Sequence, residues 1–138
     1  AGAAPVPGRQ IPHRLANGAV LVDDSYNANP GSVAAAIAAL AAGGGEAWLV
    51  LGDMKELGEG AELLHADIGA QARRAGIARL WTVGELSAHA SRAFGDDARH
   101  FADQAALVAA LAPALRAAGP GLRCVVKGSR SSANPSPR

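Results

Sequence analysis

Three clusters of polar residues each follow an apolar run, and one of them has the composition of an anion-binding loop. The clusters are DDSYNAN at 23–29, GDMKE at 52–56 and KGSRSS at 127–132. In the third cluster, Lys127, Arg130 and the backbone N–H groups around Gly128 suit a phosphate or a carboxylate. Cations and amide donors both stabilise negative charge, so this loop is a candidate binding site.

Each cluster also has a simpler interpretation. Asp and Asn favour turns because their side chains bond to the local backbone. Residues 23–29 therefore also fit a loop with a helix N-cap, 52–56 a charged loop and 127–130 a solvated turn. The four histidines are scattered, which argues against a zinc site, and His65 fits a surface or packing position. The sequence contains neither G-x-x-x-x-G-K followed by Ser or Thr nor a convincing Ser-His-Asp pattern, so a complete catalytic set is not evident.

The segments around these clusters alternate between strand and helix patterns. Asn17-Gly18 lies between two apolar runs and predicts a β-hairpin, because both residues tolerate positive φ. Short apolar runs predict later strands at 47–52, 79–84, 98–101 and 122–128. Apolar residues at helical spacing predict helices at 32–42, 61–76, 85–94 and 103–119.

Each predicted helix has an apolar face. Ser32 is the expected N-cap of the first helix, and Pro113 argues against a straight fourth helix. The residues expected to face the core are Val33, Ile37 and Leu40, then Leu64, Ile68 and Ala72, then Leu86, Ala90 and Phe94, and finally Leu107, Leu111 and Leu115.

Strands that alternate with helices predict a three-layer α/β/α fold of the Rossmann-like type. We expect a mostly parallel six-stranded sheet whose first strand, entering through the hairpin, runs antiparallel to its neighbour. Ligands bind outside the carboxyl ends of the strands in such folds, so the three polar clusters should meet at one edge of the sheet. Asp24 and Lys127 should therefore lie at the same end.

Length and charge narrow the class of protein. The 138 residues suit one domain, and a hydrophobic content of 49% allows a real core. A net charge of +1 gives no electrostatic basis for binding nucleic acid or an anionic membrane. No apolar run reaches the ~18 residues of a membrane span, and the start lacks the pattern of a secretory signal, so we expect a cytoplasmic protein. Cys124 is the single cysteine and fits a small buried hydrophobe.

The stretches DDSYNANPGSVAAAI, VLGDMKELGEGAELLHADIG and VVKGSRSS together resemble the C-terminal domain of the Mur ligases. The similarity runs from about Pro7 to Ser132, and DSYNANP is similar to the branch that adds D-Ala-D-Ala. The resemblance implies a monomeric, three-domain, ATP-dependent ligase of peptidoglycan precursor synthesis. The N-terminal domain would hold the UDP-sugar, and the central domain the phosphate-binding loop and Mg²⁺. The third domain, which this chain resembles, would close over ATP and bind the dipeptide.

The same resemblance implies a reaction and a set of site residues. ATP would phosphorylate the carboxylate of UDP-MurNAc-tripeptide, and the amine of D-Ala-D-Ala would attack the acyl phosphate. The positions implied for ATP are Arg9, Asp24, Asn27 and Asn29. Those implied for the substrates are Asp53, Lys55, Glu56, Lys127, Ser129 and Arg130, with Lys127, Asp24 and Arg9 as the catalytic residues and no metal ligand.

The domain limits also follow from the resemblance. Residues 1–8 are expected to be a linker remnant, 9–132 the Mur ligase C-terminal domain, and 133–138 an atypical or truncated tail. Pro135 and Pro137 exclude a regular helix in that tail, so one face of the sheet should be partly uncovered. The isolated domain should be inactive. The alternatives are a stand-alone module that binds a small anion or a dipeptide, and a ligase domain of another Mur or folylpolyglutamate type.

Overall fold

The computed structural model describes residues 11–24 and 28–128. Its elements are β1 (Ile11–Arg14), β2 (Val20–Asp23), α1 (Pro30–Ala42), β3 (Ala47–Gly52), α2 (Ala61–Ala75), β4 (Arg79–Val83), α3 (Ser87–Phe94), β5 (Ala98–Phe101), α4 (Gln104–Ala118) and β6 (Arg123–Lys127). The strand order across the sheet is β1-β2-β6-β3-β4-β5. Among these strands β1 and β2 pair antiparallel and the other neighbours pair parallel, which confirms the predicted sheet.

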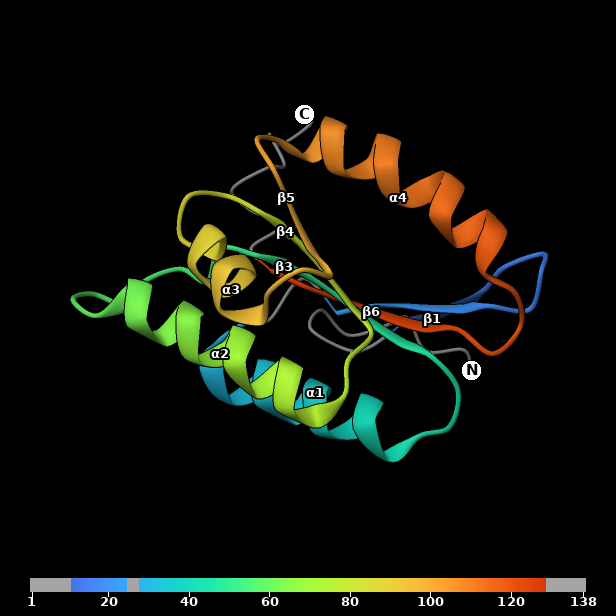
Figure 1. Cartoon of the computed structure of the whole chain (residues 1–138), viewed down its shortest axis with the longest axis horizontal. Helices are drawn as coiled ribbons and strands as arrows, with labels where there is room; N and C mark the ends of the chain where they lie inside the picture. The colour runs from blue at the N-terminus through green and yellow to red at the C-terminus, as the bar shows by residue number, and fades with distance from the viewer. Residues whose placement is uncertain (1–10, 25–27, 129–138) are drawn as a thin grey trace, which may run out of the picture.

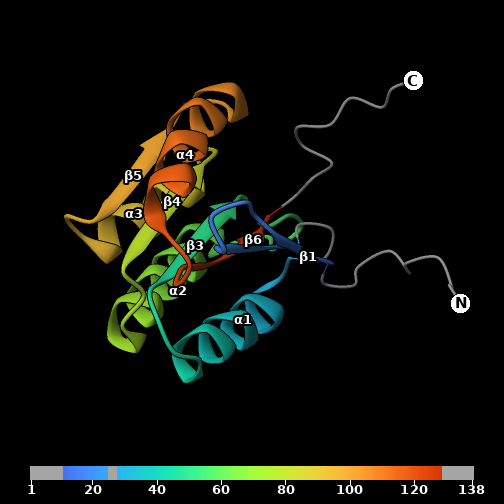
Figure 2. The same ribbon diagram turned by 90° about the vertical axis from the view of Figure 1, so that its right-hand side faces the viewer.

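The helices cover both faces of the sheet. Figures 1 and 2 show α1, α2 and α3 on one face and α4 on the other, so the predicted three layers are confirmed. The central strand β3 reads AWLVLG because both of its faces are covered, and its first five residues are all buried. The short edge strand β5 is half-buried or exposed along its length, which explains its weak signal in the sequence.

Two hydrophobic clusters hold the layers together. Val33, Ile37 and Leu40 of α1 pack with Ile68, Ala72, Ala90 and Phe94 against one face, and Leu107, Leu111 and Leu115 of α4 pack with Trp48, Trp81 and Cys124 against the other. The predicted faces of α1 and α4 are therefore confirmed. Pro113 lies inside α4, which continues through it to Ala118.

Two details of the helix predictions are wrong. Helix α1 begins at Pro30 rather than after Ser32, because Asn29 is the N-cap and Ser32 is the third helical residue. Its buried face is unaffected by this shift. In α2, Leu64 is 37% exposed and the neighbouring His65 is fully buried, so the buried face is rotated by about one residue from the prediction.

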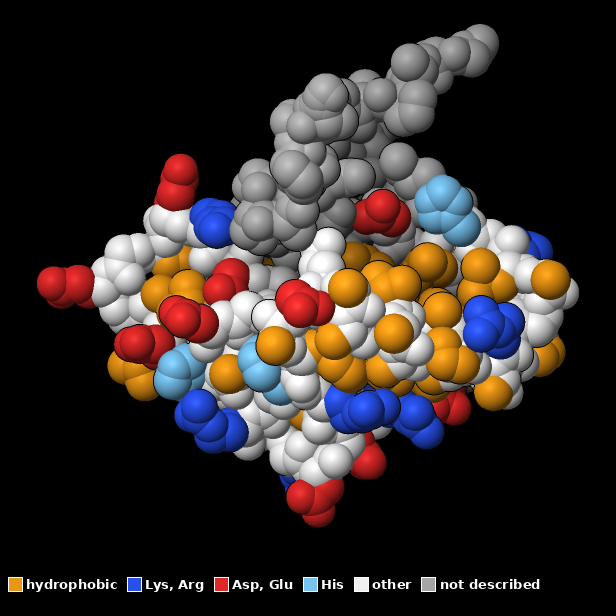
Figure 3. Space-filling model, turned by 90° about the horizontal axis from the view of Figure 1, so that it is seen from above, with side chains coloured by type: hydrophobic (Ala, Val, Ile, Leu, Met, Phe, Trp, Pro, Cys, Tyr) orange, Lys and Arg blue, Asp and Glu red, His pale blue; other side chains and the backbone are white. Residues whose placement is uncertain are grey.

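Helix α4 covers the sheet unevenly. Its main strand partners are β4 and β5, whereas Leu21 of β2 and Val126 of β6 are only partly buried beside the α4 cluster. Viewed from the side of α4, hydrophobic side chains gather on the surface (Figure 3). Val108 of α4 is 57% exposed. Asn17 ties the hairpin to this layer, since its Nδ2 donates to the carbonyls of Leu115 and Arg116.

Candidate functional site

The carboxyl ends of β2, β6 and β3 are adjacent, and one of the three polar clusters lies at each of these ends. Parallel pairing aligns Asp23 with Val126 and Leu51 with Lys127, so the residues that come next in each strand meet at one edge. The prediction that Asp24 and Lys127 lie at the same end of the sheet is confirmed. We call this rim, formed by Asp24, Lys127, Gly128 and the loop 53–58, the carboxyl edge.

Asp24 and Lys127 form a buried ion pair at the carboxyl edge. Lys127 Nζ donates to Asp24 Oδ2 at 2.8 Å, and the two side chains are 1% and 9% exposed. The Asp24 N–H also donates to the Val126 carbonyl at 2.9 Å, which extends the pairing of β2 and β6 by one residue. The interpretation of Lys127 as part of a solvated turn is therefore wrong.

Gly128 lets the ends of β3 and β6 approach closely. A methyl group at its Cα would lie 2.5 Å from the Gly52 nitrogen and 2.7 Å from the Gly52 Cα. Both neighbours are backbone atoms and cannot turn away as a flexible side chain would. The glycine in KGSR is thus required by packing before any ligand is considered.

Asp53, which follows β3, stabilises the start of α3. Its Oδ1 accepts the Ser87 N–H at 2.7 Å and its Oδ2 accepts the Leu86 N–H at 3.2 Å, so the carboxylate caps the start of α3. Gly84, with φ 106°, makes this possible, because a Cβ there would collide with the Asp53 carboxylate. The carboxylate of Asp53, a position that the resemblance implies for the substrates, is therefore already bonded to two backbone N–H groups.

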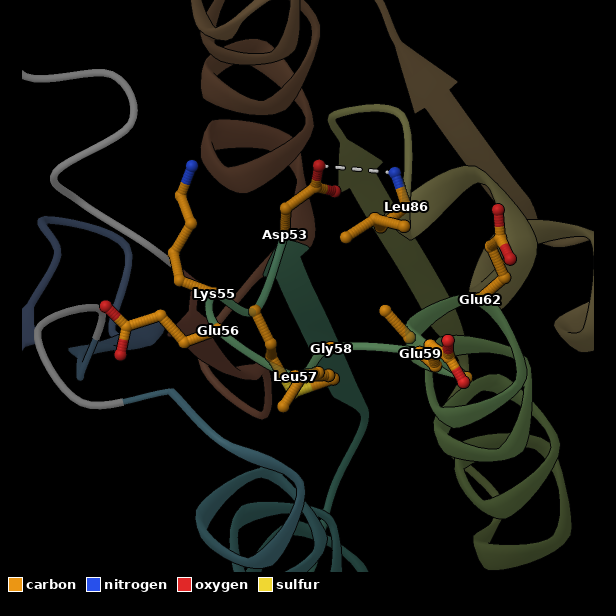
Figure 4. Close-up of a pocket in the computed structure, with 11 residues that line it drawn as sticks. Asp53, Lys55, Glu56, Leu57, Gly58, Glu59, Glu62 and Leu86 are labelled. Atoms are coloured by element: carbon orange, nitrogen blue, oxygen red, sulfur yellow. Dashed lines mark hydrogen bonds between the residues drawn. The ribbon is translucent and has the colours of Figure 1, made fainter.

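The loop after Asp53 lines a hollow of about 390 Å³ between β3 and the start of α2. Figure 4 shows Lys55 and Glu56 on one side of the hollow and Glu59 and Glu62 on the other. Lys55 and Glu56 are exposed, so their charges are available at the carboxyl edge. The hollow therefore presents both signs of charge close together.

The sequence did not indicate that Met54 and His65 fix this loop. The Met54 side chain is fully buried in the core, and its N–H donates to Nε2 of the buried His65 at 3.0 Å. His65 Nδ1 lies 2.8 Å from the Ala61 carbonyl. The helical spacing could have predicted the burial of His65, because it lies on the same face of α2 as the buried Ile68 and Ala72.

The other predicted site residues divide into two groups. Asn29 is described and caps α1: its Oδ1 accepts the Ser32 N–H at 2.8 Å, and its own N–H donates to Ser32 Oγ at 3.0 Å. This capping box places the N-terminus of α1 beyond the end of β2. The predicted roles of Arg9, Asn27, Ser129 and Arg130 lie outside the described residues.

The described residues offer no cation site. Across 11–24 and 28–128, no three His, Cys, Asp or Glu side chains gather closely enough to hold a metal ion. These residues therefore do not fit the Mg²⁺ that the resemblance implies for the whole enzyme. Nor does any described helix combine the length and apolar character of a membrane span. Cys124 is fully buried, and burial raises the pKa of its thiol to about 12.

Comparisons with other proteins match both the sequence and the fold. A UDP-N-acetylmuramoyl-tripeptide–D-alanyl-D-alanine ligase of Escherichia coli is 49% identical over 90 residues, which are 65% of this chain and 20% of the relative. One of Mycobacterium tuberculosis is 47% identical over 74 residues, 49% of this chain and 14% of the relative. The matched part of the chain thus spans 20% of the length of the E. coli relative and 14% of the length of the M. tuberculosis relative.

Solved structures agree. A crystal structure of MurF from Acinetobacter baumannii superposes with a TM-score of 0.82 and 28% identity, covering 94% of this chain and 29% of that one. MurF ligase from Thermotoga maritima, solved in complex with ADP, superposes with a TM-score of 0.75 and 25% identity. The match covers 94% of this chain and 29% of that one. The model of the family described as Mur ligase, glutamate ligase domain, matches residues 8–130. With the parallel sheet and the carboxyl edge in place, the chain belongs to this family.

Proposed function

We propose that this chain supplies the C-terminal domain of an ATP-dependent ligase that joins D-Ala-D-Ala to UDP-MurNAc-tripeptide. The observation that carries the proposal is the buried Lys127–Asp24 pair, which lies at the same edge as the Lys55–Glu56 loop. It occurs in a chain of which 90 residues align at 49% identity with a ligase of that name. A structural relative was solved in complex with ADP, which supports ATP as the nucleotide. Because such an enzyme would consume ATP, we expect it to act in the cytoplasm. The resemblance further implies a monomer.

The reaction requires positive charge where negative charge develops. In the proposed step the dipeptide ammonium first releases a proton to solvent. The amine then bonds to the acyl carbon while the bond from that carbon to the phosphate oxygen breaks, and the second proton of the amine leaves with the phosphate. Lys127, with Ser129 and Arg130 of the same loop, would stabilise the charge on the leaving phosphate. Arg9, Asp24, Asn27 and Asn29 would lie on the nucleotide side.

The dipeptide is zwitterionic, and the hollow at the carboxyl edge carries matching charges. Lys55 suits its carboxylate and Glu56 suits its amine before the proton is lost, while Asp53 holds the base of their loop. Mg²⁺ would be held mainly by the central domain, as the resemblance implies.

A chimera tests this proposal. Residues 8–130 would replace the matching part of the E. coli relative, and phosphate release would be measured with and without D-Ala-D-Ala. Dipeptide-dependent turnover is expected. A chimera that folds and binds ATP but releases no phosphate in response to the dipeptide would contradict the proposal and favour a stand-alone binding module. Use of a different amino acid in place of the dipeptide would indicate another ligase of the superfamily.

The ion pair provides the decisive variants. Removing Lys127 alone leaves Asp24 buried without its partner charge, so the double change Lys127→Met with Asp24→Asn is the cleaner test. We expect the double variant to fold and to lose at least ~100-fold in turnover, the order seen when one group that stabilises developing charge is removed. Arg74→Ala, at an exposed position on α2, is the matched control and should retain activity.

A further inference from the structure

The loop that carries Lys55 and Glu56 has an unusual backbone for its sequence. Glu56 has φ 62° and Gly58 has φ 71°, so two residues of the short loop lie in the left-handed region. Glycine adopts this region freely, whereas a glutamate there is uncommon and costs conformational energy. Such a conformation persists when surrounding contacts fix it. The contacts that fix the loop therefore determine where Lys55 and Glu56 point.

The described contacts at the start of this loop come from three directions. The Asp53 carboxylate bonds to α3, the Met54 side chain is buried in the core, and the Met54 N–H donates to His65 Nε2 at 3.0 Å. Only the last of these holds the backbone of the loop itself to α2. It comes immediately before the exposed Lys55, whereas the other backbone bond from this loop to α2, in which the Ala61 N–H donates to the Gly58 carbonyl at 3.3 Å, comes two residues after Glu56.

The hydrogen bonds of His65 define its tautomer. A backbone N–H can only donate, so Nε2 must carry a lone pair to accept from Met54. The proton of the neutral ring is then on Nδ1, which donates to the Ala61 carbonyl at 2.8 Å. Ala61 is the first residue of α2 and lines the same hollow as Lys55 and Glu56. One fully buried imidazole thus links the strand-end loop to the first turn of the helix opposite it.

We propose that His65 is a positioning residue for the amine substrate: through Met54 it holds the loop 53–58 in the shape that presents Lys55 and Glu56 at the carboxyl edge. The proposal rests on the proposed function for the identity of the substrate, but the loop geometry is independent of it. His65 does not touch the substrate. It acts as a fixed acceptor that a packing residue of the same size could not replace.

The first test uses the unmodified chain. Nitrogen-15 NMR of the histidine rings distinguishes a protonated from an unprotonated nitrogen, and His65 should show the proton on Nδ1 alone. A proton on Nε2 would overturn the proposal without any variant being made, because that nitrogen could then not accept from Met54.

The second test compares two substitutions in the full chain. His65→Gln can place a carbonyl oxygen near the Nε2 position, whereas His65→Leu removes the acceptor. In the Leu variant, exchange of the Met54 amide should rise roughly 5- to 10-fold, the equivalent of one net hydrogen bond, while Leu49 and Val50 of β3 exchange as before. The Gln variant should remain within about twofold of the original chain. His13→Leu, on the exposed side of β1, is the control for losing a histidine.

The third test measures substrate use in the chimera described above. His65→Leu should raise the KM for D-Ala-D-Ala by about the same 5- to 10-fold with the KM for ATP unchanged, and His65→Gln should restore it. A general loss of folding would lower the apparent kcat through the amount of active enzyme and would leave both KM values unchanged. If the chimera lacks dipeptide-dependent turnover but Met54 is released in the Leu variant, the function is wrong and the loop anchor stands. If the Leu variant leaves both Met54 exchange and the dipeptide KM unchanged, the positioning role is wrong.

Discussion

At the scale of single residues, the carboxyl edge depends on two opposite charges that are almost completely buried together. A charge buried alone is expensive, since transfer out of water costs several kcal/mol that only a close partner offsets. Lys127 and Asp24 satisfy this condition at 2.8 Å. The pair can therefore remain buried with both side chains in place.

The ion pair gives a prediction for stability. Lys127→Met should lower the free energy of unfolding by about 3–5 kcal/mol, because it leaves Asp24 uncompensated. The double variant with Asp24→Asn should lose much less, since neither charge remains buried. Urea unfolding of the three chains measures both values, and a single variant that is as stable as the double would show that the pair is not effectively buried.

The thiol of Cys124 gives a prediction for pH. Burial raises its pKa from 9.0 to about 12, so the folded chain keeps a proton that the unfolded chain releases above pH 9. The stabilisation is complete below that pH and is lost as pH rises toward 12, by roughly 1.4 kcal/mol per pH unit. Alkylation by iodoacetamide should therefore be slow in the folded chain at pH 8. Cys124→Ala should flatten the alkaline arm of a stability profile, and an unchanged arm would contradict this account.

At the scale of elements, the sequence predicted the strand and helix types, whereas the boundaries and one helix face depended on side-chain hydrogen bonds. Periodic apolar residues identified α1 and α4 correctly because those faces are simple hydrophobic stripes. The start of α1 moved to Pro30 because Asn29 and Ser32 cap it reciprocally. The face of α2 was misjudged because a buried histidine looks polar in a hydropathy pattern, and only its tertiary partner, Met54, explains the burial.

The cap of α1 is testable as an element. Asn29→Ala removes the acceptor of the Ser32 N–H and should destabilise the chain by about 1 kcal/mol, whereas Asn29→Asp should be nearly neutral because Asp is an equally good N-cap. Thermal unfolding by circular dichroism measures both variants. Equal losses in the two would indicate that Asn29 contributes through something other than capping.

At the scale of the whole molecule, the candidate site was predictable in position but only partly in detail. The rule that ligands bind beyond the carboxyl ends of parallel strands brought the three polar clusters to one edge, and Asp24 and Lys127 indeed meet there. Nothing local to Asp53 indicated that its carboxylate caps α3, because that contact joins residues more than thirty positions apart. The space that Gly84 provides for this carboxylate follows from the same long-range packing.

The position of β6 also determines the order in which the sheet can be completed. It is the last of the described strands along the chain, yet it lies between β2 and β3 and pairs with both. Until it is present, the hairpin β1–β2 and the group β3–β4–β5 have no strand to join them. The amino-terminal part of a chain emerges first during synthesis. The hairpin therefore cannot pair with the rest of the sheet until β6 has been made. Because β6 also carries Lys127, the carboxyl edge forms only after this strand has joined the sheet.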